Sequence, residues 1–372
     1  MAELAGLARA SGDEVEAAGR LPAPLVSALR DSQLARAWVP RELGGAEMHP
    51  RDAVAALEDL ACADGSTAWC AMVALTSGAI AAHVPEPEAQ RIFGDPAVIC
   101  GGVFAPRGRA VAQDGGFRVN GRWSFASGCL HSDWLMGGCI VEGAAPLAGG
   151  GPDVHMALLE RSQLRVEETW TASGLRGTAS HDIVAQDTLV PAPLLVSMFT
   201  APVLRGGALY AFPRFGRLAL GIAAVGLGIA RGALGDLTEL ASRRRPAGSS
   251  RPLAERGGAQ AAVARAHAAL AAARSYVEAA VDAAWDAASR GELDTGARAE
   301  LRAASTHAAR TAASVVDAMY ELGGGDSIYA HSPLQRRFRD IHVLTQHMMV
   351  APTTYELVGR VLFGLPADIS QL

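Results

Sequence analysis

The sequence predicts an α+β protein with three domains, a helical domain at each end and a β-domain between them. Apolar residues recur every three or four positions over residues 1–95 and again over residues 206–372, which is the period of amphipathic helices. Over residues 96–205 apolar and polar residues alternate instead, as they do in half-buried strands. Half of the 372 residues are apolar, so the chain can bury a large core and more than one domain.

The N-terminal domain, residues 1–95, carries the helical period in two long segments, 13–38 and 49–84. In the second segment Ala and Leu recur every three or four positions. Pro85 and Pro87 interrupt this pattern, because proline lacks the N–H that a helix interior needs. The first helical domain is therefore predicted to end soon after these prolines.

The central domain, residues 96–205, is predicted to be a compact antiparallel barrel or sandwich. In the segment DGGFRVNGRWSF, Asn120 and Gly121 stand between two alternating runs. Both residues tolerate a positive φ angle, so this pair predicts the turn of a β-hairpin. Further strands are expected in segments 133–143, 154–160, 164–170 and 181–191.

The C-terminal domain, residues 206–372, is predicted to be a four-helix bundle. Its helical segments are long and rich in small residues, which lets helices pack closely. Three glycines, 323–325, end the third long helix, and shorter helices follow from Pro333. The long helices are expected at 214–244, 253–291 and 297–322.

Composition and missing motifs exclude several classes of protein. The net charge is −5 and no basic stripe is present, so no nucleic-acid partner is expected. The chain contains no Lys, which excludes a P-loop and Schiff-base chemistry. No G-x-G-x-x-G follows a strand, and neither H-E-x-x-H nor C-x-x-C occurs. A Rossmann domain and a metal site are therefore not predicted.

Cysteine usage and the N-terminus predict a cytoplasmic protein. The five cysteines are odd in number and form no paired motif, so they are expected to be reduced thiols. The first residues turn acidic without a basic region before an apolar run, which does not fit a signal peptide. The longest uncharged apolar stretch, Leu218–Ala230, is shorter than the roughly 20 residues of a membrane span, so no membrane is expected.

Seven short segments, in order along nearly the whole chain, resemble the acyl-CoA dehydrogenase superfamily. They are most similar to its branch of reduced-flavin-dependent monooxygenases, the oxygenase components of two-component aromatic hydroxylases. The resemblance implies an N-terminal helical domain, a central β-barrel or sandwich, a C-terminal four-helix bundle and a homotetramer. The segments are WVPRELGG (38–45), DGSTAWC (64–70), GRWSFASGCLHSDW (121–134), GLRGTASHD (174–182), VPAPL (190–194), SPLQRRFRDIHVLTQH (332–347) and TYELVGRVLFG (354–364).

The resemblance also implies a flavin site. In that family the segment that matches Phe125–Gly128 lies against the flavin. The Ser127 hydroxyl would bond the reactive edge of the ring, and Gly128 would let the backbone approach it closely. Trp123 and Phe125 would supply apolar and stacking surface. Taken without the resemblance, the same residues also suit the inward-facing side of an ordinary strand.

Further flavin contacts are implied by other segments of the chain. The loop that carries Arg176, Thr178 and Ser180 matches a loop on the flavin side, and Trp170 lies just before it. Arg243 and Arg245 precede the segment 246–250, where the family binds the flavin phosphate, often from a neighbouring subunit. A glycine turn matches a turn near the cofactor. Plainer roles are a surface ion pair for the loop arginine and helix ends for the other arginines and the glycine. The residues are Trp170, Arg176, Thr178, Ser180, Arg243, Arg245 and Gly324.

The choice between dehydrogenation and oxygenation depends on a carboxylate base. An acyl-CoA dehydrogenase needs a Glu beside the flavin to remove an α-proton. In one branch this Glu follows an Arg-Asp pair by about two helical turns, and here His347 stands there. In another branch it precedes an Arg-Leu pair, and here Gly216 stands there. Glu356 comes about two turns too late. The monooxygenase branch places a His where His347 stands.

These observations predict a flavin-dependent monooxygenase that hydroxylates an aromatic or polycyclic small molecule through a flavin hydroperoxide. His347 and Ser127 are the predicted catalytic residues, because an imidazole can move a proton near working pH and a hydroxyl can steady the adduct. Reduced FMN or FAD and molecular oxygen are the expected cofactor and co-substrate. No nicotinamide motif occurs, so a separate flavin reductase is expected.

Other functions stay open from the sequence alone. Within the branch, oxidation at nitrogen or sulfur is possible. An acyl-CoA dehydrogenase with FAD and a non-standard base is a second alternative, and a non-catalytic flavin-fold binding protein is a third. His83 and His131 are candidates for holding the substrate.

Overall fold

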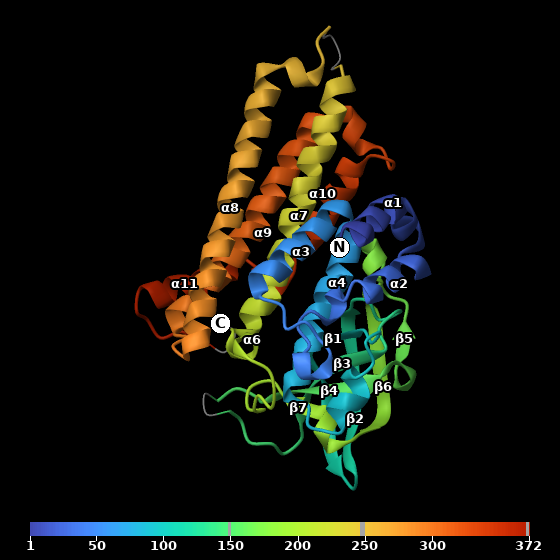
Figure 1. Cartoon of the computed structure of the whole chain (residues 1–372), viewed down its shortest axis with the longest axis vertical. Helices are drawn as coiled ribbons and strands as arrows, with labels where there is room; N and C mark the ends of the chain where they lie inside the picture. The colour runs from blue at the N-terminus through green and yellow to red at the C-terminus, as the bar shows by residue number, and fades with distance from the viewer. Residues whose placement is uncertain (148–149, 246–249, 370–371) are drawn as a thin grey trace.

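A computed structural model describes the chain except residues 148–149, 246–249 and 370–371. Figure 1 shows the C-terminal helices as a long bundle above the β-domain, with the N-terminal helices lying against both. The N-terminal helices are α1 (Ala2–Ala18), α2 (Ala23–Asp31), α3 (Pro50–Ala63), α4 (Gly65–Gly78) with the 3-10 turn η3 (Ala79–His83), and α5 (Glu88–Phe93).

The second N-terminal helical segment is divided at Asp64. The Asp64 backbone is extended, and its carboxylate accepts hydrogen bonds from the Thr67 amide at 2.7 Å and the Thr67 hydroxyl at 2.6 Å. These bonds satisfy a free N–H at the start of a helix, so α4 begins at Gly65 with its own N-cap. The chain can therefore turn between α3 and α4 while both helices stay buried.

Seven strands form one mixed sheet in the order β5-β6-β2-β1-β3-β4-β7. All neighbouring strands are antiparallel except β1 and β3, which are parallel. The expectation of a purely antiparallel domain is wrong for this pair, because the chain leaves β2 and crosses to the other side of β1. The strands are β1 (Cys100–Gln113), β2 (Gly116–Ala126), β3 (Trp134–Val141), β4 (Val154–Glu160), β5 (Arg165–Glu167), β6 (His181–Val190) and β7 (Leu195–Ser197).

The hairpin predicted at Asn120–Gly121 does not occur there. Both residues lie inside β2, and the turn between β1 and β2 is made by Asp114 and Gly115, with Gly115 at φ +85°. The Asn120 side chain instead accepts a hydrogen bond from the Asp187 amide of β6 at 2.7 Å. Gly121 is needed for a different reason: a Cβ at this position would lie 2.5 Å from the Trp123 ring.

Trp123 fills the core of the β-domain rather than facing a ligand. Its side chain is fully buried, and its ring lies over Gly108, Gly121 and Gly137, where a Cβ would come within 2.5 Å of it. Its indole N–H donates to the Gly138 carbonyl at 2.8 Å. The prediction that Trp123 contacts the flavin is therefore corrected to a structural role.

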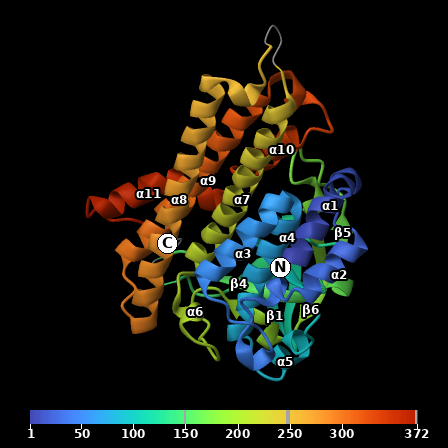
Figure 2. The same ribbon diagram turned by 45° about the horizontal axis from the view of Figure 1, so that its top comes forward.

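The C-terminal helices run side by side, and Figures 1 and 2 both show α7, α8 and α9 as the long members of the bundle. Small residues face their neighbours on these helices, so the axes approach closely. The helices are α6 (Ala208–Ala211), α7 (Arg214–Arg243), α8 (Gly257–Arg290), α9 (Thr295–Gly323), α10 (Pro333–Leu344) and α11 (Thr353–Leu362).

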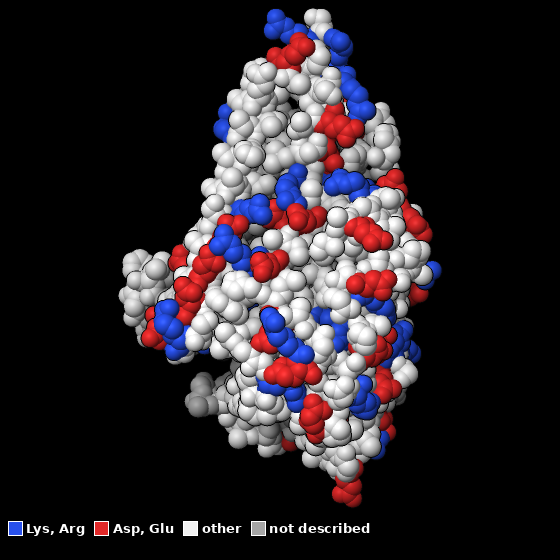
Figure 3. Space-filling view, viewed as in Figure 1, with Lys and Arg blue, Asp and Glu red and all other residues white. Residues whose placement is uncertain are grey.

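The N-terminal helices and the bundle share one hydrophobic core, while the β-domain has a second core. Ion pairs strengthen the first junction at the surface: Arg51 of α3 reaches Asp282 of α8 at 2.5 Å, and Arg231 of α7 reaches Asp59 of α3 at 2.6 Å. Figure 3 shows basic and acidic side chains interspersed across this face. Each such exposed pair contributes about 0–1 kcal/mol, so the shared core dominates.

Helix α4 lies where the two cores meet, because it contacts α7 and β1. It runs antiparallel to α7. Gly65 stands against Ile229 at one end, and Gly221 stands against Met72 further along, where a Cβ would meet the Met72 side chain at 2.6 Å. These two contacts fix which residues of α4 lie beside which residues of α7.

Two described helical segments are long and apolar enough to cross a membrane by length and composition, which the sequence prediction did not anticipate. They are Gly65–His83 and Arg214–Arg243. Their most apolar windows are 89% and 78% buried inside the protein. Burial of this extent is typical of core helices. The two segments, α4 with its continuation and α7, pack against each other in this protein.

Candidate functional site

A chain of four polar side chains connects α4 to the loop before β6. The Trp69 indole N–H donates to Ser127 Oγ at 3.0 Å, and Ser127 Oγ lies 2.7 Å from Ser180 Oγ. Ser180 Oγ lies 2.6 Å from Thr178 Oγ1, which donates to the Leu175 carbonyl at 2.8 Å. All four side chains are buried, so these contacts are not exchanged with bulk water.

The direction of this chain is fixed by its two ends. A hydroxyl carries one proton, and the carbonyl at one end can only accept while the indole at the other can only donate. Thr178 therefore donates to Leu175, Ser180 donates to Thr178, and Ser127 donates to Ser180. One lone pair of Ser127 accepts from Trp69. What remains at Ser127 is a second lone pair, so Ser127 can offer a ligand only a hydrogen-bond acceptor.

An exposed aromatic wall stands beside Ser127. Phe125 is 70% exposed and adopts φ +66°, at a shift of the β2–β6 register between Trp123 and Ala126. A bulge of this kind re-aims a side chain, and a left-handed aromatic residue is a strained conformation that marks functional positions. Phe125 meets Trp170 edge to face at 6.2 Å, and the Trp170 indole N–H donates to the Leu175 carbonyl at 3.1 Å.

Helix α10 holds the loop that carries Thr178 and Ser180. Asp340 accepts a hydrogen bond from the Leu175 amide at 2.6 Å, and Arg339 donates to the Ser173 carbonyl. Arg339 is also paired with Glu16 of α1 at 2.7 Å. Burial raises the pKa of Asp340 to about 7. The Arg-Asp pair thus positions the loop from the bundle side.

His347 is held as a neutral imidazole with a defined tautomer. Its Nδ1 accepts a hydrogen bond from the Met349 amide at 3.2 Å, so the single ring proton lies on Nε2. Burial, and then the charge of Arg302, lowers the pKa of His347 to about 4. His347 therefore offers a hydrogen-bond donor near neutral pH. Its ring centroid lies 5.9 Å from that of Trp69.

Trp69 thus brings the two predicted catalytic residues together, with the acceptor Ser127 on one side and the donor His347 on the other. The segment DGSTAWC, which ends at Cys70, carries part of the family resemblance, but no role was predicted for Trp69 from the sequence. The available signal was a Trp in an otherwise apolar helix, because a buried indole N–H needs a partner. From the sequence, Asp340 only marked the position of His347 along the chain. In the structure it also anchors the loop through the Leu175 amide.

Several predicted flavin contacts lie around this centre. Phe125 and Trp170 form the aromatic wall, Thr178 and Ser180 belong to the hydroxyl chain, and Gly128 at φ +74° donates its amide to the Thr178 carbonyl at 2.8 Å. Arg176 differs from these, because it is exposed and its nearest ion-pair partner, Glu16, lies 4.0 Å away at the surface. The plainer role of a surface ion pair describes it.

A single chain does not bring Arg243, Arg245 and Gly324 to Ser127. Arg243 is the last residue of α7, Arg245 follows it closely, and Gly324 follows α9; both helices end at the end of the bundle far from the β-domain (Figures 1 and 2). Arg243 pairs with Glu239 of its own helix at 2.7 Å. A Cβ on Gly324 would lie 2.5 Å from the guanidinium of Arg244, which was not singled out. Most of the segment 246–250 lies outside the described residues. A role in cofactor binding therefore needs a second subunit.

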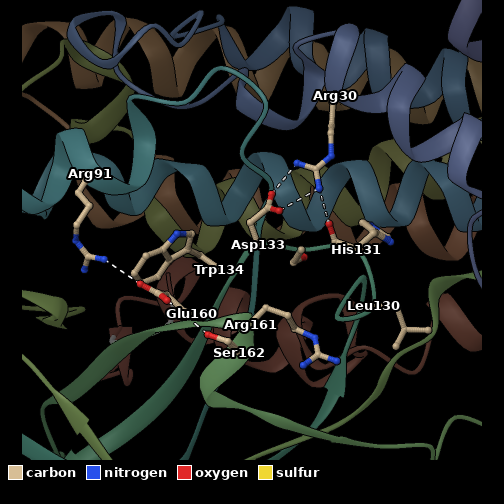
Figure 4. Close-up of a pocket in the computed structure, with 10 residues that line it drawn as sticks. Arg30, Arg91, Leu130, His131, Asp133, Trp134, Glu160, Arg161 and Ser162 are labelled. Carbon is tan, nitrogen blue, oxygen red and sulfur yellow. Dashed lines mark hydrogen bonds and ion pairs between the residues drawn. The ribbon is translucent and has the colours of Figure 1, made fainter.

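A polar groove of about 600 Å³ lies elsewhere, beside β3 and α2, and includes His131 (Figure 4). Its charges neutralise one another: Arg30 pairs with Asp133 at 2.6 Å, and Arg91 pairs with Glu160 at 3.0 Å. Burial and the charge of Arg30 lower the pKa of His131 to about 4. Arg91 also lies over the Trp134 ring at 4.9 Å, and Arg161 donates to the Cys129 and Leu164 carbonyls, so the cations of this groove already have partners within the protein.

The residues around Ser127 fit a flavin ring. Phe125 and Trp170 offer apolar and aromatic surface to a planar tricyclic group, and Ser127 offers an acceptor to a ring N–H. The dehydrogenase alternative lacks its base here. Asp340 is engaged by the Leu175 amide, and Glu356 is exposed on α11.

Comparisons with known proteins agree with this fold. Residues 8–92 match the family model of the acyl-CoA dehydrogenase N-terminal domain, and residues 220–352 match that of its C-terminal domain. Indole-3-acetate monooxygenase of Pseudomonas putida is 35% identical over 91% of this chain and 86% of its own length. The oxygenase component of the FADH2-dependent resorcinol hydroxylase of Rhizobium sp. is 30% identical over 98% of this chain and 93% of its own length.

Among solved structures, XiaF from Streptomyces sp., in complex with FADH2 and glycerol, superposes with a TM-score of 0.90 at 28% identity, covering 100% of this chain and 97% of that one. The chain belongs to the acyl-CoA dehydrogenase family. Its relatives place it in the flavin-dependent aromatic monooxygenases of that family, so it is an oxidoreductase.

Proposed function

We propose that this chain is the oxygenase component of a two-component system, and that it hydroxylates an aromatic small molecule at the centre formed by Ser127, Trp69 and His347. A separate reductase would supply the reduced FMN or FAD, and molecular oxygen would be the co-substrate. The names of the two relatives above, an oxygenase component and an indole-3-acetate monooxygenase, support this assignment.

The observation that carries the proposal is the fixed direction of the hydroxyl chain. Ser127 can only accept from a ligand, and the reduced flavin ring has an N–H at N5 that the oxidised ring lacks. Ser127 therefore matches the reduced form. When bound, reduced flavin supplies the electrons that activate oxygen. Ser127 would accept a hydrogen bond from such a ring N–H, and Trp69 keeps Ser127 oriented for it.

His347 supplies the complementary group. It is neutral because burial lowers its pKa, and its proton lies on Nε2 because Nδ1 is engaged. Its Nε2–H can donate a hydrogen bond to an oxygen atom of the aromatic substrate or of the oxygen co-substrate. The buried indole of Trp69 lies beside its ring, with 5.9 Å between the ring centroids, and shields that face of the imidazole from water.

The test is an anaerobic titration of the protein with reduced and with oxidised flavin, followed by product analysis with phenols and indoles under oxygen. We expect tighter binding of the reduced form and a hydroxylated product when a reductase is added. Ser127→Ala should weaken the preference for reduced flavin about five- to tenfold, the worth of about one hydrogen bond. Ser305→Ala, which removes a buried hydroxyl of α9, is the matched control. Equal binding of both redox forms would contradict the proposal.

We also propose a homotetramer in the cytoplasm. Apolar side chains on and after α11 are exposed in the single chain, with Leu362 77% and Phe363 82% exposed. Side chains of this kind are usually covered by another protein surface. All five cysteines are free thiols, which supports a reducing compartment.

A further inference from the structure

Helix α4 opens to solvent along one side only. Of its fourteen residues, only Val73 and Thr76 are partly exposed. They follow Trp69 at positions i+4 and i+7, so the three side chains lie on the same side of the helix. The helical turn that continues α4 ends at His83. The side of α4 that carries Trp69, Val73 and Thr76 is therefore the partly exposed side, and it continues towards His83.

Two arginines stand at the His83 end of this side without a counter-ion. Arg217 is 4% exposed. Its guanidinium makes one hydrogen bond, to the Leu209 carbonyl at 3.0 Å, and lies over the Tyr210 ring at 5.9 Å. Arg214 contacts His83 Nε2 at 3.4 Å. His83 Nδ1 donates to the Pro202 carbonyl at 2.9 Å, which leaves Nε2 free to accept from Arg214. Among the described residues, no carboxylate lies within ion-pair distance of either arginine.

This arrangement differs from that of two other buried arginines, Arg36 and Arg337. Arg36 donates to three backbone carbonyls, and Arg337 is paired with Asp236. The remaining nitrogens of Arg214 and Arg217 have no such partners, and unlike Arg36 Nε they are not sealed from open space. Two uncompensated guanidiniums side by side are costly, because each loses water and repels the other. Burial lowers the pKa of Arg217 to about 9 and that of Arg214 to about 10, which reflects that cost.

The register of α4 and α7 fixes how far this cationic pair lies from the Ser127 centre. Met72 meets Gly221, and the helices are antiparallel. Arg217 precedes Gly221 by one turn, on the same side of α7, and Trp69 precedes Met72 by three residues. At 1.5 Å per residue the two are offset by about 10 Å along α4. That span suits a bicyclic aromatic ring with a short acidic side chain.

We propose that the substrate is an aromatic carboxylic acid whose carboxylate is bound by Arg214 and Arg217. Guanidinium groups pair with carboxylates through two parallel hydrogen bonds, so the pair both neutralises and orients the acid. His83 positions Arg214. Val73 and Thr76 lie beside the ring, and the carbon to be hydroxylated faces Trp69 and His347. This inference rests on the proposed function, since it names the substrate class of the same site.

The experiment measures direct binding by calorimetry, without flavin and without turnover. Indole-3-acetate and 3-methylindole are the probes, because they share the ring and differ in the carboxylate. We expect the wild-type protein to bind indole-3-acetate at least tenfold more tightly. Arg217→Met and Arg214→Met should abolish that preference and leave 3-methylindole binding unchanged. Arg231→Met, on the same helix and paired with Asp59, is the control and should keep the preference.

If the wild-type protein binds the two probes equally, the inference is wrong. This comparison needs no variant, so it holds even where a variant fails to fold. Loss of binding of both probes alike in a folded Arg217→Met protein, judged by circular dichroism, also overturns the inference. Failure of the proposed function looks different. In that case the carboxylate preference persists, but reduced flavin does not bind preferentially and no hydroxylated product forms.

Discussion

At the scale of single residues, the partner to which the Ser127 hydroxyl donates decides whether Ser127 can donate to a ligand or only accept from it. Ser180 takes the Ser127 proton because Thr178 has already given its own to a carbonyl. A serine in the same place without these partners could donate or accept. The chemistry at Ser127 is thus set by residues that do not face the ligand.

Removing Ser180 tests this directly. In Ser180→Ala the Ser127 proton loses its partner and becomes free to turn towards a ligand. Oxidised flavin, whose N5 is an acceptor, should then bind more tightly, and the preference for reduced flavin should fall about fivefold, the worth of about one hydrogen bond. The ratio of the two dissociation constants is the measurement. An unchanged ratio, with Ser305→Ala as the control, would show that the hydroxyl chain does not set the preference.

The half-buried His347 should make the stability of the protein depend on pH. Its pKa is about 4 in the folded protein and ordinarily 6.5, so between these values the unfolded chain takes up a proton that the folded chain does not. Stability should therefore fall as the pH is lowered from 6.5 to 4, by up to about 1.4 kcal/mol per pH unit from this residue. Urea unfolding of wild type and His347→Gln at several pH values measures the slope, which should be shallower in the variant. Identical slopes would exclude this contribution.

At the scale of elements, α10 and the loop before β6 act as one unit. Asp340→Ala leaves the Leu175 amide buried without an acceptor, which costs about 1–3 kcal/mol of folding free energy. Asp340→Asn keeps an acceptor and should retain flavin binding. It should also remove a pH dependence: the raised pKa of Asp340 means that its protonated form is favoured by folding, so wild-type stability falls as the pH rises through about 7. Thermal unfolding of wild type and Asp340→Asn at pH 5 and pH 8 measures this, because the contribution of His347 is common to both proteins. An equal change in stability in the two proteins would contradict the prediction.

Element types and their order were predictable from periodicity, but two local features were not. The Asn120–Gly121 pair has the chemistry of a hairpin turn, yet Asp114–Gly115 six residues earlier makes the turn. The sequence could not show that the glycine was needed beneath Trp123, because that contact is tertiary. The parallel pairing of β1 with β3 also depends on which side of β1 the chain returns to, and no local pattern encodes that.

The centre of the site was predictable only in part. Ser127 and His347 were found through the family resemblance, and the structure links them through Trp69. Trp69 was missed because its partner lies 58 residues away in sequence. Trp123 was misplaced because an aromatic residue next to a site motif and one in a sheet core look alike in sequence. Arg243 and Arg245 lie at the end of α7 that points away from the β-domain, and this chain does not bring them to Ser127.

At the scale of the whole molecule, the exposed apolar side chains near α11 predict an assembly. Phe363→Glu places a charge where we expect a neighbouring subunit, so the tetramer should weaken and its mass fall in light scattering. If Arg243 and Arg245 reach the cofactor across that assembly, flavin affinity should fall with it. Glu321→Gln, at an end of α9 that is not part of the apolar patch, is the control. A wild-type protein that is monomeric at all concentrations would remove the basis for this proposal.

The core that the first and last helices share also dictates an order of assembly during synthesis. The helices up to Phe93 leave the ribosome long before α7 and α9 exist, and the whole β-domain is made in between. The β-domain has its own core and can form early, whereas α4 must wait with its apolar side uncovered. Nascent chains stopped before residue 208 are therefore the species that a chaperone would bind and that would aggregate first. Completion of α9 closes the core and ends that exposure.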